Sequence, residues 1–138
     1  MNKEIKSESK EIKSDLNLYD INKQLIEQTE KPLSQKELNK IKSNLILPYF
    51  REKIVKEGIC YFMLLCHEKR DYTVFNISDW YPIIVLELLD CLKNRGQIYS
   101  IEKTKDKLAL EIWIKDAQTN ELSCYYLFPY DDGVIEIF

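Results

Sequence analysis

The sequence predicts an α+β domain in which N-terminal helices pack with a mostly antiparallel sheet. Three observations lead to this prediction. A helix start of the capping-box type lies in the first half, an eight-residue apolar run occupies residues 59–66, and strand-like patterns of period two fill residues 98–128. With 138 residues, 45% of them hydrophobic, the chain is long enough to bury a core without a disulfide or a metal.

The first 14 residues are expected to form a flexible charged leader. They contain a near repeat, Lys-Glu-Ile-Lys-Ser-Glu and Lys-Glu-Ile-Lys-Ser-Asp, whose single isoleucine per seven residues is too little for a coiled coil. Residues 15–138 are expected to form a single α+β domain. Its first helix is predicted over residues 15–29, where apolar residues recur at helical spacing.

The clearest local signal in the sequence is a helix start at Ser34. Glu37 stands three residues later, so that each side chain can bond the backbone N–H of the other residue. Pro48 interrupts this helix, which predicts either a kink or a second helix with Pro48 in its first turn. The apolar face continues until Gly58, where we expect the helix to end.

Residues 59–77 are predicted to form a β-hairpin. The apolar run at 59–66 precedes a charged group at 68–71, and a second β-rich run follows at 72–77. Because the first strand is apolar on both alternating faces, we expect it inside a sheet that is covered on both sides. If this cover is incomplete, the uncovered part of the hairpin is where we expect a partner.

The next helix is predicted from Trp80 to about Asn94, with Gly96 as its stop. Most of its circumference is apolar and only a narrow stripe is polar, so it needs cover on two sides. The sheet is expected to supply one cover, and an N-terminal helix or a second copy of the protein the other. One alternative function is therefore a structural homodimer through the helix between Trp80 and Leu92.

The last part of the chain is predicted to form a four-strand antiparallel meander. Charged or glycine-containing turns separate the expected strands, at residues 98–102, 108–115, 122–128 and 134–138. Pro129 indicates that the end of the third of these strands lies at an edge or a bulge. Trp113 shares a face with Glu111 and Lys115, so it is either a half-exposed platform or packed under the N-terminal helices.

The sequence lacks the residue sets that catalysis and cofactor binding need. His67, the one histidine, lies next to Cys66, and neighbours on a strand point to opposite faces, so the two cannot form a nucleophile and base pair. The three glycines form no phosphate-binding loop, and the four cysteines lie in apolar runs typical of reduced core residues. We therefore expect no enzymatic activity, no cofactor and no metal. Without a signal peptide or an apolar membrane span, we expect a cytoplasmic protein.

Charge divides the chain into two unlike halves. Residues 1–70 carry 14 basic and 11 acidic side chains, whereas residues 71–138 carry 6 and 12, so the halves have net charges of +3 and −6. The acidic half is also rich in tyrosine, and aromatic anchors among charges are typical of protein interfaces. We therefore predict a protein that binds a basic partner through this half. The predicted contact residues are Trp113, Glu111, Glu121, Tyr125, Tyr130, Asp131 and Asp132.

A second hypothesis is a nucleic-acid-binding regulator. Between residues 31 and 70, nine basic residues outnumber four acidic ones. Such a surplus suits phosphate contacts, although no recognition-helix or RNP-like motif accompanies it. The candidate residues for this function are Lys36, Lys40, Arg51, Lys53, Lys69 and Arg70.

In its small size, its lack of catalytic residues and its Lys-, Ile- and Asn-rich composition, the chain is similar to small accessory proteins of phages and other mobile elements. Many of those proteins bind and inhibit a host protein. The resemblance, which covers no specific motif, implies an inhibitor of a host nucleic-acid-binding or defence protein.

Overall fold

The computed structural model of this protein describes residues 19–28, 31–76 and 81–130, and the chain divides into two compact units, Met1–Lys31 and Pro32–Phe138. In the first unit, residues 19–28 are helical, as the sequence predicts for this stretch. The predicted leader over residues 1–14 lies outside the described residues. The strands and the remaining described helices belong to the second unit.

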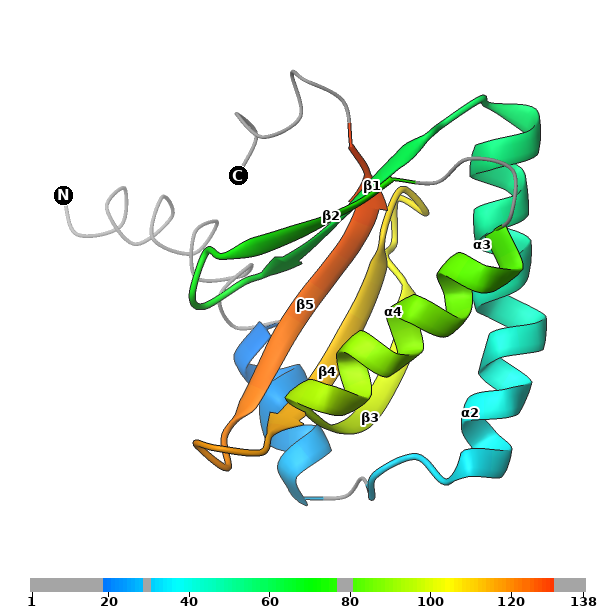
Figure 1. Cartoon of the computed structure of the whole chain (residues 1–138). Helices are drawn as coiled ribbons and strands as arrows, with labels where there is room; N and C mark the ends of the chain where they lie inside the picture. The colour runs from blue at the N-terminus through cyan, green and yellow to red at the C-terminus, as the bar shows by residue number, and fades with distance from the viewer. Residues whose placement is uncertain (1–18, 29–30, 77–80, 131–138) are drawn as a thin grey trace, which may run out of the picture. The chain divides into compact units, whose positions relative to one another are not determined.

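The second unit is built on a five-stranded antiparallel sheet packed with helices, which confirms the predicted α+β class. In order across the sheet, the strands are β2 (Tyr72–Asn76), β1 (Tyr61–Cys66), β5 (Leu122–Pro129), β4 (Leu110–Asp116) and β3 (Gly96–Lys103). The predicted hairpin is β1 and β2, and β3, β4 and β5 form a meander (Figure 1). The fourth predicted strand of the meander, at 134–138, lies outside the described residues.

Pairing between β5 and β1 joins the meander to the hairpin. Leu127 of β5 lies opposite Leu64 of β1 on one side and opposite Leu110 of β4 on the other. β1 is therefore an internal strand, as predicted, and its residues 62–66 are all buried. β5 is internal too, but its end at Pro129 has no partner from β4 among the described residues, which agrees with the edge predicted for this strand end. Pro129 lies beyond the last β5 residue that β4 pairs, so its missing N–H removes no bond to β4.

One long helical run precedes the sheet. It comprises α2 (Gln35–Ile41), a π-helical segment (Lys42–Ile46), α3 (Leu47–Arg51) and a second π-helical segment (Glu52–Lys56). The predicted capping box starts this run. Glu37 N–H donates to Ser34 Oγ at 3.2 Å, and Ser34 N–H donates to Glu37 Oε1 at 3.2 Å. The bond from the Ser34 backbone lowers the pKa of the Glu37 carboxyl.

The helical run continues through Pro48. In the turn just before it, Leu47 N–H donates to the Lys42 carbonyl, five residues back instead of four. A proline ring in a regular α-helix presses on the carbonyl four residues back, and the wider π-type turn relieves that clash. Of the two predicted outcomes, the structure shows the second: Pro48 lies in the first turn of another α-helical segment, α3.

Gly58 ends the helical run, as predicted. Its φ of 71° lies in the left-handed region, which glycine adopts without the strain that a Cβ would cause. Ile59 N–H donates to the Lys53 carbonyl at 2.9 Å, and Gly58 N–H donates to the Ile54 carbonyl at 3.1 Å. These two carbonyls near the end of the helix are therefore bonded before the chain enters β1.

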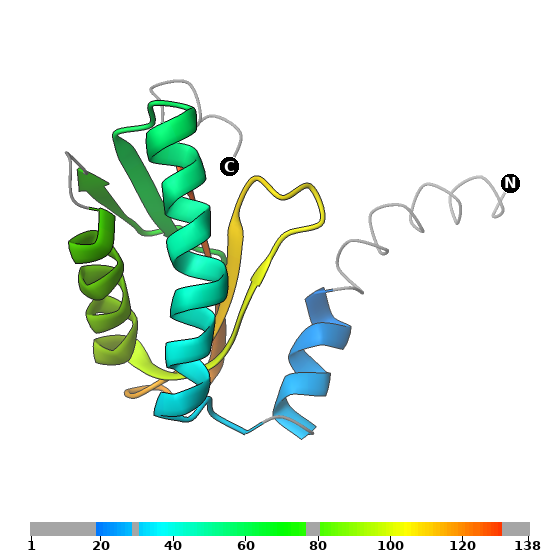
Figure 2. The same ribbon diagram turned by 90° about the vertical axis from the view of Figure 1, so that its right-hand side faces the viewer.

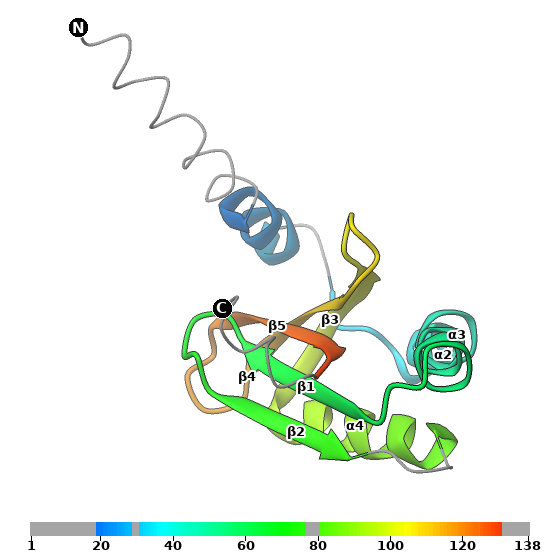
Figure 3. The same ribbon diagram turned by 90° about the horizontal axis from the view of Figure 1, so that it is seen from above.

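α4 (Tyr81–Arg95) and the run from α2 to α3 lie on the same side of the sheet, which we call the helix face (Figures 2 and 3). Val85, Leu88 and Leu92 are fully buried, and α4 contacts α3 as well as β3 and β4. The second cover predicted for this helix is therefore α3. The solvent-facing side of α4 is less polar than the sequence predicts, because Ile83 and Leu86 are 51% and 49% exposed.

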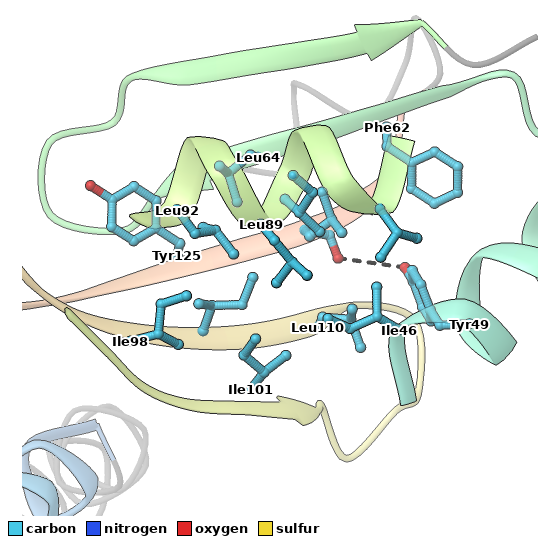
Figure 4. Packing of buried hydrophobic residues seen from close by; sticks show 14 of the residues in the cluster. Ile46, Tyr49, Phe62, Leu64, Leu89, Leu92, Ile98, Ile101, Leu110 and Tyr125 are labelled. Carbon is cyan, nitrogen blue, oxygen red and sulfur yellow. Dashed lines mark hydrogen bonds between the residues drawn. The ribbon is translucent and has the colours of Figure 1, made fainter. Parts of the chain in front are cut away.

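The main core fills the space between the helix face and the helices (Figure 4). Tyr49 connects its layers, because its hydroxyl donates to the Leu108 carbonyl at 2.8 Å and to the Leu127 carbonyl at 3.5 Å. Burial raises the pKa of Tyr49, which keeps the hydroxyl a neutral donor. Other fully buried core side chains are Ile46, Phe62, Leu64, Val85, Leu88, Leu92, Leu110, Ile112 and Leu127.

Candidate protein-binding surface

The opposite side of the sheet, which we call the outer face, is also lined by apolar side chains of β1. Phe62 and Leu64 point into the main core on the helix face. Because neighbouring residues of a strand point to opposite faces, Tyr61, Met63 and Leu65 project from the outer face. One strand thus supplies apolar residues to both sides of the sheet.

Three side chains on the outer face of the hairpin are exposed. The β1–β2 register places Val74 and Tyr72 on the same face as Tyr61. The exposed fractions are 44% for Tyr61, 55% for Tyr72 and 39% for Val74. The half-buried Tyr130 lies beside them, with its ring centroid 6.4 Å from that of Tyr61 in an edge-on arrangement. We call these four residues the aromatic patch.

The aromatic patch adjoins a buried floor. Met63, Leu65 and Phe128 form a second hydrophobic cluster, and each is no more than 5% exposed. Met63 of β1 lies opposite Phe128 of β5, so hydrogen-bonded strands hold the floor. A patch supported in this way loses little conformational freedom when a partner binds, which favours binding.

Beside the floor, His67, Tyr126 and Glu111 form a polar group. The Tyr126 hydroxyl donates to Glu111 Oε1 at 3.4 Å, and the His67 ring stands edge-on to the Tyr126 ring with centroids 6.2 Å apart. Burial lowers the pKa of His67 and raises the pKa of Tyr126. Both side chains are therefore neutral near pH 7.

The turn of the hairpin is fastened to the neighbouring strands. The Glu68 carboxylate accepts from the Cys124 N–H at 3.2 and 3.3 Å, and His67 N–H donates to the Cys124 carbonyl at 2.8 Å. Lys69 Nζ lies 3.7 Å from the carboxylate of Asp116, the last residue of β4. These contacts hold the start of β2, and with it Tyr72, in a fixed position relative to β5.

Two residues predicted to contact a partner are buried. Trp113 is 1% exposed and Tyr125 is 3% exposed, so neither ring is available as a surface anchor. For Trp113, the alternative of a half-exposed platform is therefore wrong. Tyr125 lies opposite Cys66 and points to the helix face, where the Arg95 guanidinium stands 5.3 Å from its ring centroid.

The other predicted contact residues are dispersed. Glu111 and Tyr130 are half-buried. Tyr130 belongs to the patch, whereas Glu111 reaches the outer-face cluster only through its bond from Tyr126. Glu121 is exposed at the end of the turn between β4 and β5. Asp131 and Asp132 lie outside the described residues.

The candidate nucleic-acid-binding residues do not form one patch. The exposed candidates are Lys36, Lys40, Arg51, Lys69 and Arg70. The last two belong to the turn of the hairpin, which lies at the end of β1 and β2 away from the helical run (Figures 1 and 3). Lys53 is 6% exposed, and its Nζ lies 3.0 Å from the Glu57 carboxylate, so it is withdrawn from phosphate contacts.

The chain also has a hollow on its helix side. Its volume is about 300 Å³, and the lining residues are Ser43, Leu47, Pro48, Arg51 and Pro82. The exposed Ile83 and Leu86 belong to the same helix as Pro82. The predicted homodimer through α4 would use this side of the molecule, and it stays a prediction.

Sequence reasoning missed Tyr61, Tyr72 and Val74 as binding residues. It did locate the hairpin and expect a partner at any uncovered part of it. The missing step was the register: aligning the two strands about the charged turn places Tyr72 and Val74 on the face of Tyr61. The register could have been predicted from the sequence, but the exposure of these three side chains could not.

Within the described residues, no group of three or more His, Cys, Asp or Glu side chains is placed to hold a metal ion. Cys66 and Cys124 point to opposite faces of the sheet, because Cys66 pairs with Tyr125, the neighbour of Cys124. In the same part of the chain, no helix is both long and apolar enough to cross a membrane.

Comparisons with protein-family models, with characterised proteins and with solved structures found no match to this chain. Its function is therefore inferred from the chemistry of its surface. In the described part of the chain, the aromatic patch is where exposed apolar side chains gather on one strand pair.

Proposed function

We propose that this protein is a non-enzymatic, cytoplasmic protein-binding protein that docks a partner on the aromatic patch. The observation that supports the proposal is the exposure of Tyr61, Tyr72 and Val74 on one face of one hairpin. Single exposed apolar side chains are common on protein surfaces, whereas adjacent ones beside a buried floor are typical of interaction sites. Tyrosine is also enriched among the residues that dominate binding energy.

The proposed partner has an apolar centre with basic residues around it. Glu111 accepts from Tyr126, which packs against the buried floor of the patch, and Asp71 is exposed next to Tyr72 in the sequence. Asp131 and Asp132 follow Tyr130 in the chain, whose residues 71–138 carry the net charge of −6. An acidic rim favours encounter with a basic surface. Together with the compositional resemblance to mobile-element proteins, this supports an inhibitor of a host nucleic-acid-binding or defence protein.

The test compares two double variants of the full-length tagged protein in capture from a lysate of the source organism. Tyr61→Ser with Tyr72→Ser removes two patch side chains that are 44% and 55% exposed. Ile83→Ser with Leu86→Ser removes two α4 side chains of matching exposure, 51% and 49%. We expect wild type and the α4 variant to recover the same partner, and the patch variant to bind it at least about tenfold more weakly.

Two results would contradict the proposal: wild type recovers no protein partner, or the patch variant recovers it as well as wild type does. The charge of the partner is tested separately with Asp131→Lys and Asp132→Lys, which we expect to slow association more at low salt than at high salt. A titration with short DNA and RNA at low salt addresses the nucleic-acid hypothesis. Binding that Lys36→Glu abolishes would favour that hypothesis over ours.

A further inference from the structure

The two edges of the sheet differ in how they are protected. Within the described chain, neither β2 nor β3 pairs with another strand on its outer side. β3 nevertheless has three protecting features: a register shift between Ile98 and Ser100, a hydrogen bond from Leu33 N–H to the Ile98 carbonyl at 2.8 Å, and charged residues at its end, Glu102 and Lys103. Bulges, covering segments and charges are the usual devices against unwanted strand pairing.

Among the described residues, β2 has none of these devices. Its five residues, Tyr-Thr-Val-Phe-Asn, include no charge and no proline, and they pair with β1 through five consecutive partners without a register shift. Tyr72, Val74 and Asn76 are exposed, and Thr73 and Phe75 are half-buried. The strand is also held in place, because Arg95 donates to the Thr73 hydroxyl at 3.2 Å. A regular, neutral and rigid edge strand is suited to pair with another strand.

We infer that β2 is the dimerisation strand of this protein and that it pairs antiparallel with β2 of a second copy. A two-fold axis through Val74 places this residue opposite its own copy, Thr73 opposite Phe75, and Tyr72 opposite Asn76. All of these pairs are neutral, so no like charges meet across the axis. β-Branched and aromatic residues opposite each other stabilise sheets.

A second copy fits this edge better than an unrelated charged segment, because β2 offers no charge for such a segment to recognise. In a two-fold dimer the β2 edge of each copy is occupied by the other copy, so association stops at the dimer and does not continue into a fibre. The two-fold axis also places the outer faces of both sheets on the same side of the dimer. The two aromatic patches then adjoin across the axis, which doubles the surface available for the proposed partner. This interface is distinct from the α4 homodimer considered above.

The test measures the mass of the full-length protein by analytical ultracentrifugation. Wild type is expected at twice the 16.5 kDa of one chain at micromolar concentrations. Val74→Lys and Val74→Asp each place two like charges across the axis, so each variant alone is expected to sediment as a monomer. An equimolar mixture of the two places opposite charges there and is expected to recover the dimer. Circular dichroism of each variant checks that it is folded.

Covalent trapping gives a readout that does not depend on introduced charges. In a Cys60→Ser background, Val74→Cys is expected to form a disulfide-linked dimer under mild oxidation, because Cα atoms directly opposite in an antiparallel pair are about 4.5 to 5.5 Å apart, within the range that disulfides span. Ile83→Cys in the same background is the control for α4 and is expected to stay monomeric on denaturing gels.

Three results would overturn the inference: a monomeric wild type up to millimolar concentration, a dimer that Val74→Lys leaves intact, or efficient trapping through Ile83→Cys in place of Val74→Cys. The mass measurement involves no partner. Failure of the dimer is therefore distinguishable from failure of the proposed partner binding, which is measured by capture.

Discussion

At the scale of single residues, two glycines hold helix ends for different reasons. A Cβ on Gly96 would lie 1.9 Å from the Lys115 carbonyl oxygen, because the start of β3 approaches the backbone of β4. That neighbour is strand backbone, which cannot move aside as a flexible side chain can. Gly58 has nothing within 4 Å of such a Cβ, and only its φ of 71° favours glycine. The sequence signal, a glycine after a helix, is the same in both cases.

We predict that Gly96→Ala destabilises the protein much more than Gly58→Ala does. The strain of a left-handed alanine at position 58 costs about 1 kcal/mol. The backbone clash at position 96 forces β3 and β4 apart and is expected to cost more than about 3 kcal/mol. Urea unfolding followed by circular dichroism measures both free energies of unfolding. Equal losses in the two variants would contradict the close approach at Gly96.

At the scale of elements, the hairpin turn depends on the carboxylate of Glu68, an exposed residue. Glu68 accepts the Cys124 N–H and so fastens the turn between β1 and β2 to β5. Burial raises the pKa of Glu68 above its usual value, although the bond from Cys124 opposes that shift. The carboxylate therefore holds the turn in place, but its charged form at neutral pH is less stable in the folded protein than in the unfolded chain.

We predict that Glu68→Gln gains stability relative to wild type as pH rises from about 4 to 7. A carboxyl whose pKa is raised by folding contributes its stability in full below the unfolded-state pKa and loses it as pH rises through the folded-state pKa. Glutamine still offers an oxygen to the Cys124 N–H but does not ionise. Urea unfolding at both pH values measures the difference. A difference that is independent of pH would contradict the prediction.

At the scale of the whole molecule, the sheet carries buried residues on both faces. Cys66 lies in the main core on the helix face, and Cys124 is fully buried and points to the outer face. Burial raises the pKa of the Cys124 thiol, which lowers its fraction of reactive thiolate further. Both thiols belong to adjacent paired strands, β1 and β5, so unfolding of the sheet exposes them together.

We predict that the thiols of Cys66 and Cys124 become reactive toward Ellman's reagent at the same urea concentration, in the transition that abolishes the circular dichroism signal. Cys60 is exposed and is expected to react in the native protein, and Cys60→Ser removes that fast phase. Mass spectrometry of the labelled peptides assigns each thiol. Labelling of one buried thiol at a much lower urea concentration than the other would show that the two faces of the sheet open separately.

The sequence by itself determined the elements whose causes are local. The start of the helical run at Ser34 depends on a side chain three residues away, its end at Gly58 on one backbone angle, and the hairpin on two apolar runs about a charged turn. The α+β class follows from these signals and from the period-two strands. Such causes act over a few residues, so a reading of the chain in order finds them.

Only the tertiary structure decided which faces are covered. Alternation along a strand shows which residues share a face, as it did for Trp113 and Glu111, but not whether other segments cover that face. Trp113 and Tyr125 are buried, while Tyr61, Tyr72 and Val74 are exposed, because burial depends on contacts between residues far apart in the sequence. The pairing of β5 with β1, which makes β2 an edge strand, is a long-range contact of the same kind. The candidate site therefore depends on long-range contacts, which only the tertiary structure shows.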